Sequence, residues 1–263
     1  RYGADVTCVE GEWGRAIDPA AVEARLKEAT FDLVAVVHAE TSTGVCNPVA
    51  DIARLAHAHD ALVIVDAVTS LGAMPLEVAA WGVDACYSCS QKGLGAPSGM
   101  APVVFSPRAL ERLVDCRSFY LDLNLLLDYW VRRKYHHTIS APLVYALAEA
   151  LGEVEDEGLE ARWERHRMVH EAFVEAMARL GLTLLPPPPE RLWSLNTVRV
   201  PAGVDEARVR KQLLERESIE IGAGLGPLAG QIFRIGLMGS GATLENVERL
   251  STALAAALQE SRV

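Results

Sequence analysis

Helical and strand-like segments alternate along the first 106 residues, and this alternation constrains the fold more than any other feature. A helical period is present at 18–30 and 48–60, and Asp18 before Pro19 is expected to cap the first of these helices. Strands separated by helices predict βαβ units, so we expect an α/β fold with a mainly parallel sheet. The apolar runs typical of buried strands are 31–40, 61–66, 83–90 and 101–106.

The pattern changes from about Ile139 onward. Residues 141–181 have an almost continuous helical pattern, with a predicted break near Gly158. A strand at 193–200, a helix at 205–217, strands near 219–223 and 231–238 and a closing helix at 243–259 follow. This order predicts a small α+β domain packed on a larger α/β domain. We place the boundary within the long helical stretch, giving domains of 1–152 and 153–263.

Charge, hydropathy and cysteine content exclude several classes of protein. The formal net charge is −10, which argues against a nucleic-acid partner because such proteins need a basic face. No apolar run reaches transmembrane length, so a membrane protein is not expected. The five cysteines are odd in number in a chain of 263 residues, which disfavours a disulfide framework. Reduced thiols and a cytoplasmic location are the prediction.

Polar side chains follow three of the predicted strands. The strand ends read HAETSTG (38–44), VDAVTSLG (65–72) and SCSQKG (88–93). In open α/β sheets ligands bind at the carboxyl ends of strands, so a hydroxyl cluster, the Asp66 carboxylate and the Lys92 amine are predicted to share one edge. Asp66 and Lys92 are 26 residues apart, about one βα unit.

Pyridoxal phosphate catalysis needs such a set of groups. A lysine amine forms a Schiff base with the aldehyde, and a carboxylate keeps the pyridine nitrogen protonated. Glycines after the lysine would let the backbone approach the ligand. The chain has no G-x-x-x-x-G-K-[ST] motif, which excludes Asp66 as part of a nucleotide-binding pair. A capping aspartate and a surface lysine remain the alternative at this point.

Five segments resemble a known family. HAETSTGV, LVIVDAVTSLG, YSCSQKGLGAPSG, YHHT and GLGPLAGQIFRIGLMG, in this order, closely resemble the alanine–glyoxylate and serine–pyruvate aminotransferases, which are class V aminotransferases. The resemblance covers essentially all of the chain. It implies the pyridoxal 5′-phosphate-dependent transferase fold type I, with a large, mainly parallel α/β domain and a small C-terminal α+β domain.

The resemblance also implies roles for individual residues. Lys92 would be the catalytic Schiff-base lysine, and Asp66 the partner of the ring nitrogen. Thr41 would lie by the phenolic oxygen of the cofactor, Val68 would pack on one ring face, and Gln91 would help to bind the phosphate. In this family the YHHT segment reaches the phosphate bound by the neighbouring subunit. That implies a homodimer with shared active sites, to which Tyr135 and Thr138 contribute.

Arg234, in FRIGLMG, matches the arginine with which the family binds the substrate carboxylate. A guanidinium can hold a carboxylate with two parallel hydrogen bonds, which suits amino acid and 2-oxo acid substrates. The implied activity is a ping-pong transfer of an amino group from alanine, or serine, to glyoxylate. Lys92 would move the proton during each half-reaction.

Alternatives within the superfamily stay open to different degrees. A ureidoglycine–glyoxylate aminotransferase is the nearest, but that subgroup carries Asn-His-Thr where this chain has His136, His137 and Thr138. A cysteine desulfurase needs a nucleophilic cysteine, often in the C-terminal half, whereas the last cysteine here is Cys116. A phosphoserine aminotransferase would need further basic residues for the phosphate.

The chain departs from the family at its beginning. We expect an N-terminal portion of the large domain to be missing, and with it a glycine-rich phosphate-binding turn and an aromatic residue that stacks on the cofactor ring. A catalytically incomplete fragment is therefore a further alternative.

No metal site is predicted. Cys86 and Cys89 form a C-x-x-C pair, but two further ligands at suitable spacing are absent, so packing thiols are expected. His57 and His59 are two residues apart on a predicted helix and face different ways.

Overall fold

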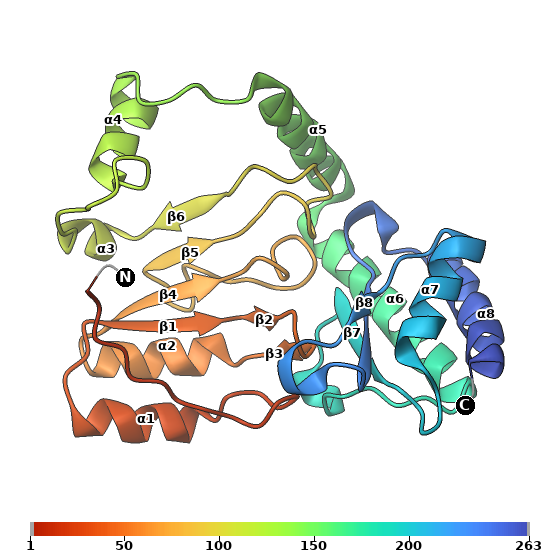
Figure 1. The fold of residues 1–263 in the computed structure, drawn as a ribbon. Helices are drawn as coiled ribbons and strands as arrows, with labels where there is room; N and C mark the ends of the chain where they lie inside the picture. The colour runs from red at the N-terminus through yellow and green to blue at the C-terminus, as the bar shows by residue number, and fades with distance from the viewer. Residues whose placement is uncertain (1–2, 262–263) are drawn as a thin grey trace.

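The computed structural model describes residues 3–261. Its N-terminal half contains the strands β1 (Leu33–Val37), β4 (Leu62–Asp66), β5 (Ala85–Tyr87) and β6 (Val103–Phe105). These strands form one sheet in the order β1-β4-β5-β6 (Figure 1). The first three are parallel, and β6 runs antiparallel to β5. The predicted α/β class and mainly parallel sheet are confirmed.

Two helices cover one face of this sheet, α1 (Pro19–Glu28) and α2 (Val49–Ala58) (Figure 1). The side chain of Asp18 accepts a hydrogen bond from the Ala20 amide, and Pro19 begins the helix, as predicted. Ile52 of α2 is 1% exposed and packs with Val22 and Leu26 of α1. Valine, isoleucine, leucine and alanine side chains therefore form the core between these helices and the sheet.

The predicted strand at 31–40 is interrupted. It continues past β1 as the short strand β2 (Ala39–Glu40), which pairs antiparallel with β3 (Val45–Cys46). The intervening turn contains Gly44 with φ +74°, a conformation that suits glycine. This hairpin places Thr41 beyond the carboxyl edge of the sheet.

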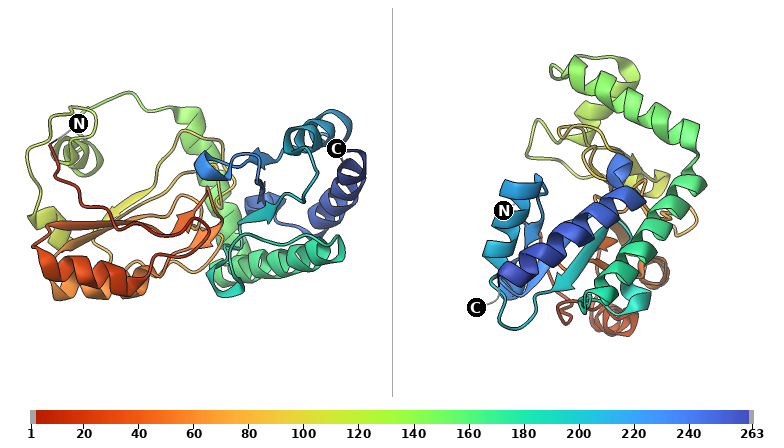
Figure 2. Two further views of the ribbon diagram at one scale, coloured as in Figure 1. Left: turned by 60° about the horizontal axis from the view of Figure 1, so that its bottom comes forward. Right: turned by 90° about the vertical axis from the view of Figure 1, so that its right-hand side faces the viewer.

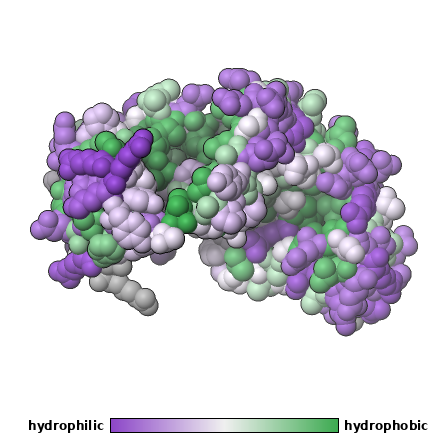
Figure 3. All heavy atoms as spheres, turned by 90° about the horizontal axis from the view of Figure 1, so that it is seen from above, coloured by the Kyte–Doolittle hydropathy of each residue, from purple (hydrophilic) through white to green (hydrophobic). Residues whose placement is uncertain are grey.

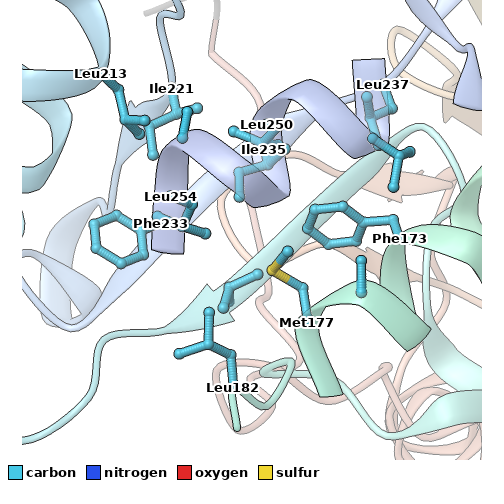
Figure 4. Packing of buried hydrophobic residues seen from close by; sticks show 14 of the residues in the cluster. Phe173, Met177, Leu182, Leu213, Ile221, Phe233, Ile235, Leu237, Leu250 and Leu254 are labelled. Atoms are coloured by element: carbon cyan, nitrogen blue, oxygen red, sulfur yellow. The ribbon is translucent and has the colours of Figure 1, made fainter. Parts of the chain in front are cut away.

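The C-terminal half forms an antiparallel sheet. Its strands are β7 (Leu195–Arg199), β8 (Gly222–Ala223) and β9 (Ile232–Gly236), in the order β7-β9-β8. The helices α6 (Leu159–Arg179), α7 (Glu206–Glu217) and α8 (Leu244–Glu260) pack around a fully apolar core (Figure 4). Phe173 and Met177 of α6 meet Phe233 and Ile235 of β9 there. Figure 2 shows the two sheets as lobes lying side by side.

One interruption divides the long helical stretch, as predicted. Helix α5 (Ala141–Glu157) ends at Gly158, whose φ is +81°, and α6 begins directly after it. The predicted domain boundary at 152/153 lies five residues before this break, inside α5, and stays a prediction. The short helices α3 (Pro107–Glu111) and α4 (Leu123–Arg132) complete the fold, with single 3₁₀ turns at Pro188–Glu190, Gly226–Leu228 and Gly239–Gly241.

Helix α4 and the segments around it expose many apolar side chains. No residue of α4 is buried, although the helix is strongly amphipathic. Trp130 is 50% exposed and Tyr135 is 74% exposed. Figure 3 shows hydrophobic residues gathered on the side seen from above, where α4 and α5 lie. Exposed apolar patches are typical of surfaces that bind a partner or a ligand.

Between residues 3 and 261, no helix combines the length and the apolar character that a membrane crossing requires.

Candidate active site

Asp66 ends β4 and is held by two hydrogen bonds. Its Oδ1 accepts from the Val68 amide at 2.8 Å, and its Oδ2 accepts from the Tyr87 hydroxyl at 2.9 Å. Tyr87 stands opposite Asp66 because β4 and β5 are parallel neighbours. Burial, and then the hydrogen bond to Asp66, raise the pKa of Tyr87 to about 12, so the phenol stays a donor. Each carboxylate oxygen has two lone pairs and can accept one more hydrogen bond.

Lys92 lies in the segment that joins β5 to β6, residues 88–102, hereafter the lysine loop. Ladder-like hydrogen bonds continue into this loop, from the Ser88 amide to the Pro102 carbonyl (2.9 Å) and from the Ser90 amide to the Met100 carbonyl (3.0 Å). The Gly95 amide donates to the carbonyl of Lys92 itself. The loop is therefore an ordered continuation of the sheet, and the half-buried Lys92 stands on fixed backbone.

Gly93, directly after Lys92, is required because another segment of the chain packs closely against it. A Cβ on Gly93 would lie 2.1 Å from the Leu71 carbonyl oxygen, which is impossible without a backbone shift. Gly72, next to Leu71, has φ +77°. The sequence predicts that glycines after Lys92 let the backbone approach a ligand. The structure gives Gly93 a different reason, namely the close approach of the lysine loop to the turn after Asp66.

Arg234 brings the C-terminal sheet to the same edge. It lies in β9, and its Nη1 donates to the Thr41 carbonyl at 3.2 Å. Its Nε donates to the Ala223 carbonyl at 2.6 Å. The remaining N–H groups of the guanidinium have no acceptor among residues 3–261. The fork of the guanidinium is thus oriented and still has donors free for a carboxylate.

The thiol of Cys89 joins the turn after Asp66 to the lysine loop. Its Sγ lies 3.7 Å from the Val68 carbonyl oxygen. Burial raises the pKa of Cys89, and burial, with the nearby Asp66 charge, raises the pKa of Cys86 to about 11. Both are free thiols that stay protonated and unreactive at neutral pH, in keeping with the packing role predicted for them.

The side chains at this edge fit pyridoxal phosphate. Within the described part of the chain, the Lys92 amine, the Thr41 hydroxyl and the Gln91 amide make no hydrogen bond or ion pair. The segments that follow β1, β4 and β5 thus carry an unpaired hydroxyl, an oriented carboxylate, and an unpaired amide and amine, and the partly free guanidinium of Arg234 binds the first of these segments. These are the donors and acceptors that an aldehyde, a phenolic oxygen, a phosphate and a pyridine nitrogen would need.

Tyr135 and Thr138 lie elsewhere. They belong to the coil between α4 and α5, where the Tyr135 hydroxyl and the Thr138 hydroxyl are 2.9 Å apart. His136 is buried against Phe119, with ring centroids 4.5 Å apart, and shares a 2.8 Å contact with His137. No hydrogen bond in the described residues links this coil to Asp66, Lys92 or Arg234. The predicted reach of Tyr135 and Thr138 into a neighbouring subunit stays a prediction.

Sequence reasoning did not identify three residues that support the site. Tyr87 contacts Asp66, Arg162 contacts the lysine loop, and His166 contacts the turn after β9. Register between parallel strands would have indicated Tyr87, because it precedes the lysine loop as Asp66 precedes its own loop. No local signal distinguishes Arg162 and His166 from the other charged residues of α6.

Comparisons with known proteins point the same way. The family model described as aminotransferase class-V matches residues 1–250. The chain is 38% identical to the (S)-ureidoglycine–glyoxylate transaminase of Bacillus subtilis, over 94% of this chain and 65% of that protein. It is 36% identical to the alanine–glyoxylate aminotransferase of Drosophila melanogaster, over 100% of this chain and 69% of that protein.

Solved structures include a similar fold. The crystal structure of the alanine–glyoxylate aminotransferase from Nostoc sp. matches with a TM-score of 0.95 and 43% identity. The match covers 98% of this chain and 70% of that one. The chain thus spans about two thirds of the length of these proteins, and 65% in the Bacillus subtilis case.

Proposed function

The chain belongs to the class V aminotransferase family, and from that premise we propose that it transfers an amino group from alanine, or serine, to glyoxylate with pyridoxal 5′-phosphate as cofactor. The proposal is supported by three observations: Asp66 ends β4 and is oriented by Val68 and Tyr87, Lys92 lies in the loop that follows the neighbouring strand β5, and Arg234 binds the Thr41 carbonyl.

Each residue at this edge has a proposed task. Bound pyridoxal phosphate would supply an aldehyde and an electron-accepting ring. Asp66 would hold the proton on the ring nitrogen, and Thr41 and Gln91 would bind the phenolic oxygen and the phosphate. Val68 would support one ring face. Lys92 would attach the cofactor and then carry the proton taken from Cα of the amino acid.

Arg234 would bind the carboxylate of each substrate in turn. Its Nε and Nη1 are committed to the carbonyls of Ala223 and Thr41, which fixes the plane of the guanidinium. Orientation by buried backbone reduces the side-chain entropy lost on substrate binding. The same arginine can serve donor and acceptor because amino acids and 2-oxo acids share the carboxylate.

Absorption spectroscopy tests the proposal. The chain mixed with pyridoxal phosphate should develop a visible band that bleaches on addition of L-alanine, and glyoxylate should restore it. Lys92→Ala should remove both changes. A band that ignores alanine and serine would contradict the donor assignment. The absence of any band would contradict the proposed activity of this chain and favour the alternative of a catalytically incomplete fragment.

A second candidate is transfer from (S)-ureidoglycine to glyoxylate. The 38% identity to the Bacillus subtilis transaminase supports it, whereas His136 stands where that subgroup has asparagine. Both ring nitrogens of His136 are already in contact with protein groups, the Phe119 carbonyl and His137. Comparing kcat/KM for alanine, serine and ureidoglycine in one glyoxylate-dependent assay separates the two candidates.

We also propose a homodimer with shared active sites. The exposed apolar side chains of α4 and of the following coil support an interface there, and they include Trp130, Val131 and Tyr135. Mixing and refolding Lys92→Ala with Tyr135→Ala chains tests it. Shared sites would restore about a quarter of the parental activity, because one site of each mixed dimer would carry neither substitution. Sites built within one subunit would give no recovery.

A cytoplasmic location is proposed on the five free thiols, which suit a reducing compartment. Oxidation of these thiols in material isolated from cells would contradict it.

A further inference from the structure

The first turns of α6 contact two loops that are distant in sequence. One is the lysine loop, and the other is the turn at 238–242, which follows β9. Arg162 is 3% exposed, and its Nη2 donates to the Gly93 carbonyl at 2.9 Å. His166 is fully buried, and its Nε2 accepts a hydrogen bond from the Gly239 amide at 3.1 Å.

We propose that Arg162 and His166 are positioning residues that hold the lysine loop and the 238–242 turn in one fixed arrangement and so fix the direction of Lys92. This inference rests on the proposed function, because it assigns the two residues to the placement of the catalytic amine. Both would act through the backbone of the two loops, because their hydrogen bonds there go to Gly93 and Gly239.

Arg162 is itself held in place by an ion-pair network. Its Nη1 lies 2.7 Å from Glu157 Oε2. Arg165 binds the same carboxylate with its Nε, at 2.5 Å, and its Nη2, at 2.9 Å. Two cations share one carboxylate, and backbone carbonyls supply further acceptors, although Arg162 Nε has no partner among the described residues. Arg165 accordingly donates to the carbonyls of Gly239, at 3.0 Å, and Ala242, at 2.8 Å.

His166 completes the link as a neutral ring. Its Nδ1 faces the Arg162 carbonyl at 2.8 Å, so Nδ1 carries the proton and Nε2 is the acceptor. Burial lowers the pKa of His166 to about 4, which keeps this tautomer neutral above that pH. A protonated ring could not accept from the Gly239 amide.

The two loops also touch each other beside Lys92. A Cβ placed on Gly239 would lie 3.2 Å from Gly95 Cα and 3.3 Å from the Lys92 carbonyl oxygen. Gly239 has φ +60°, so this close approach depends on glycine. The 238–242 turn thus packs on the backbone of Lys92. Helix α6 forms hydrogen bonds with both this turn and the lysine loop.

The test compares buried and exposed arginines of one helix. Arg162→Met removes the donor to the Gly93 carbonyl and the charge paired with Glu157, and keeps an unbranched side chain in the buried position. Arg167→Met is the matched control, because among the described residues Arg167 pairs only with Glu164 and Glu171, and its side chain is 42% exposed. His166→Leu removes the acceptor, and His166→Gln retains one. Arg162→Lys retains a single charged donor.

Hydrogen–deuterium exchange of the full chain without cofactor gives the first readout. We expect exchange at residues 93–96 and 239–242 to rise roughly tenfold or more in Arg162→Met and His166→Leu, because a hydrogen bond to a buried group is lost in each. In Arg167→Met, exchange at the same residues should change less than about twofold, because exposed ion pairs contribute little to stability. Equal exchange in Arg162→Met and Arg167→Met would overturn the proposal.

Steady-state kinetics with alanine and glyoxylate give the second readout. A displaced Lys92 should lower kcat by roughly 10- to 100-fold while KM stays within about threefold, since positioning acts on the chemical step. Arg162→Lys and His166→Gln should recover part of kcat. A wild-type chain without transaminase activity would refute the proposed function, and exchange would still decide whether α6 holds the loop. Wild-type activity with unchanged kcat in Arg162→Met would overturn the positioning role alone.

Discussion

At the scale of single residues, hydrogen bonds orient the functional side chains. Backbone carbonyls orient Arg234, and the Tyr87 hydroxyl orients Asp66. Arg234 uses two donors on backbone carbonyls and keeps the rest for a ligand. Arg234→Lys loses the planar fork, so we expect kcat/KM for alanine to fall about 10- to 100-fold, mainly through KM. The measurement is a steady-state titration of alanine, and an unchanged KM would contradict carboxylate binding by Arg234.

Tyr87 donates its hydroxyl proton to Asp66, and Tyr87→Phe removes that bond alone. Without it, Oδ2 of the Asp66 carboxylate loses the donor that orients it, and only the Val68 amide still holds the group. A less firmly oriented carboxylate would hold the protonated pyridine nitrogen less well, and we expect the dissociation constant of pyridoxal phosphate to rise about threefold to tenfold. Fluorescence titration with the cofactor measures this. Equal affinity in Tyr87→Phe would show that the Val68 amide suffices to orient Asp66.

At the scale of elements, the lysine loop depends on its glycine. In Gly93→Ala the new methyl would collide with the Leu71 carbonyl, so we expect a loss of more than about 2 kcal/mol in the free energy of unfolding. A Cβ placed on Gly152 of α5 would meet no heavy atom within 4 Å, and Gly152→Ala should instead stabilise by about 0.5–1 kcal/mol. Urea unfolding of both variants checks the opposite signs.

A buried carboxylate joins strand β4 to the helices α2 and α3. Asp84, 3% exposed, accepts from the Val63 amide, Ser106 and Arg108, and contacts His57. Burial raises its pKa, but these hydrogen bonds and the Arg108 charge outweigh burial, and the net pKa is lowered.

Because the lowered pKa favours the ionised form in the folded chain, the Asp84 contribution to stability is present above about pH 4 and is lost as the pH falls further. Asp84→Asn should cost about 3 kcal/mol at pH 7, since it leaves Arg108 without its buried partner. The difference in the free energy of unfolding between the unsubstituted chain and Asp84→Asn should narrow toward pH 3. A difference that is independent of pH would contradict the ionic role.

How much of this could be predicted from sequence differs by element. The helix at Pro19–Glu28 was predictable because its capping aspartate and proline are local signals, and Gly158 was predictable as a break for the same reason. The position of Asp66 at the end of β4, and of Lys92 in the loop after β5, followed from the βα order. The Arg162–Gly93 bond was not predictable, because its partners are 69 residues apart and nothing in either segment specifies the other.

At the scale of the whole molecule, buried histidines make stability depend on pH. Burial lowers the pKa of both His38 and His166 to about 4. The unfolded chain therefore binds more protons than the folded chain between about pH 6.5 and 4, and stability falls as the pH falls through this range. We expect each histidine to remove roughly 2 kcal/mol between pH 7.5 and 5.

Urea unfolding at these two pH values measures the loss. His166→Gln should show a smaller loss than the unsubstituted chain, because Gln does not titrate. An equal loss in both proteins would assign the effect to other groups.

The bond between Arg162 and Gly93 also limits how the catalytic segment can be reused. The stretch YSCSQKGLGAP reads as a portable cassette, yet one of its buried carbonyls is satisfied by a side chain from another lobe. Grafted onto a foreign scaffold without the equivalent of α6, the cassette would carry an unsatisfied acceptor, and it would also lose the backbone of Gly239 against Lys92. A designer would therefore have to transplant three stretches of sequence together.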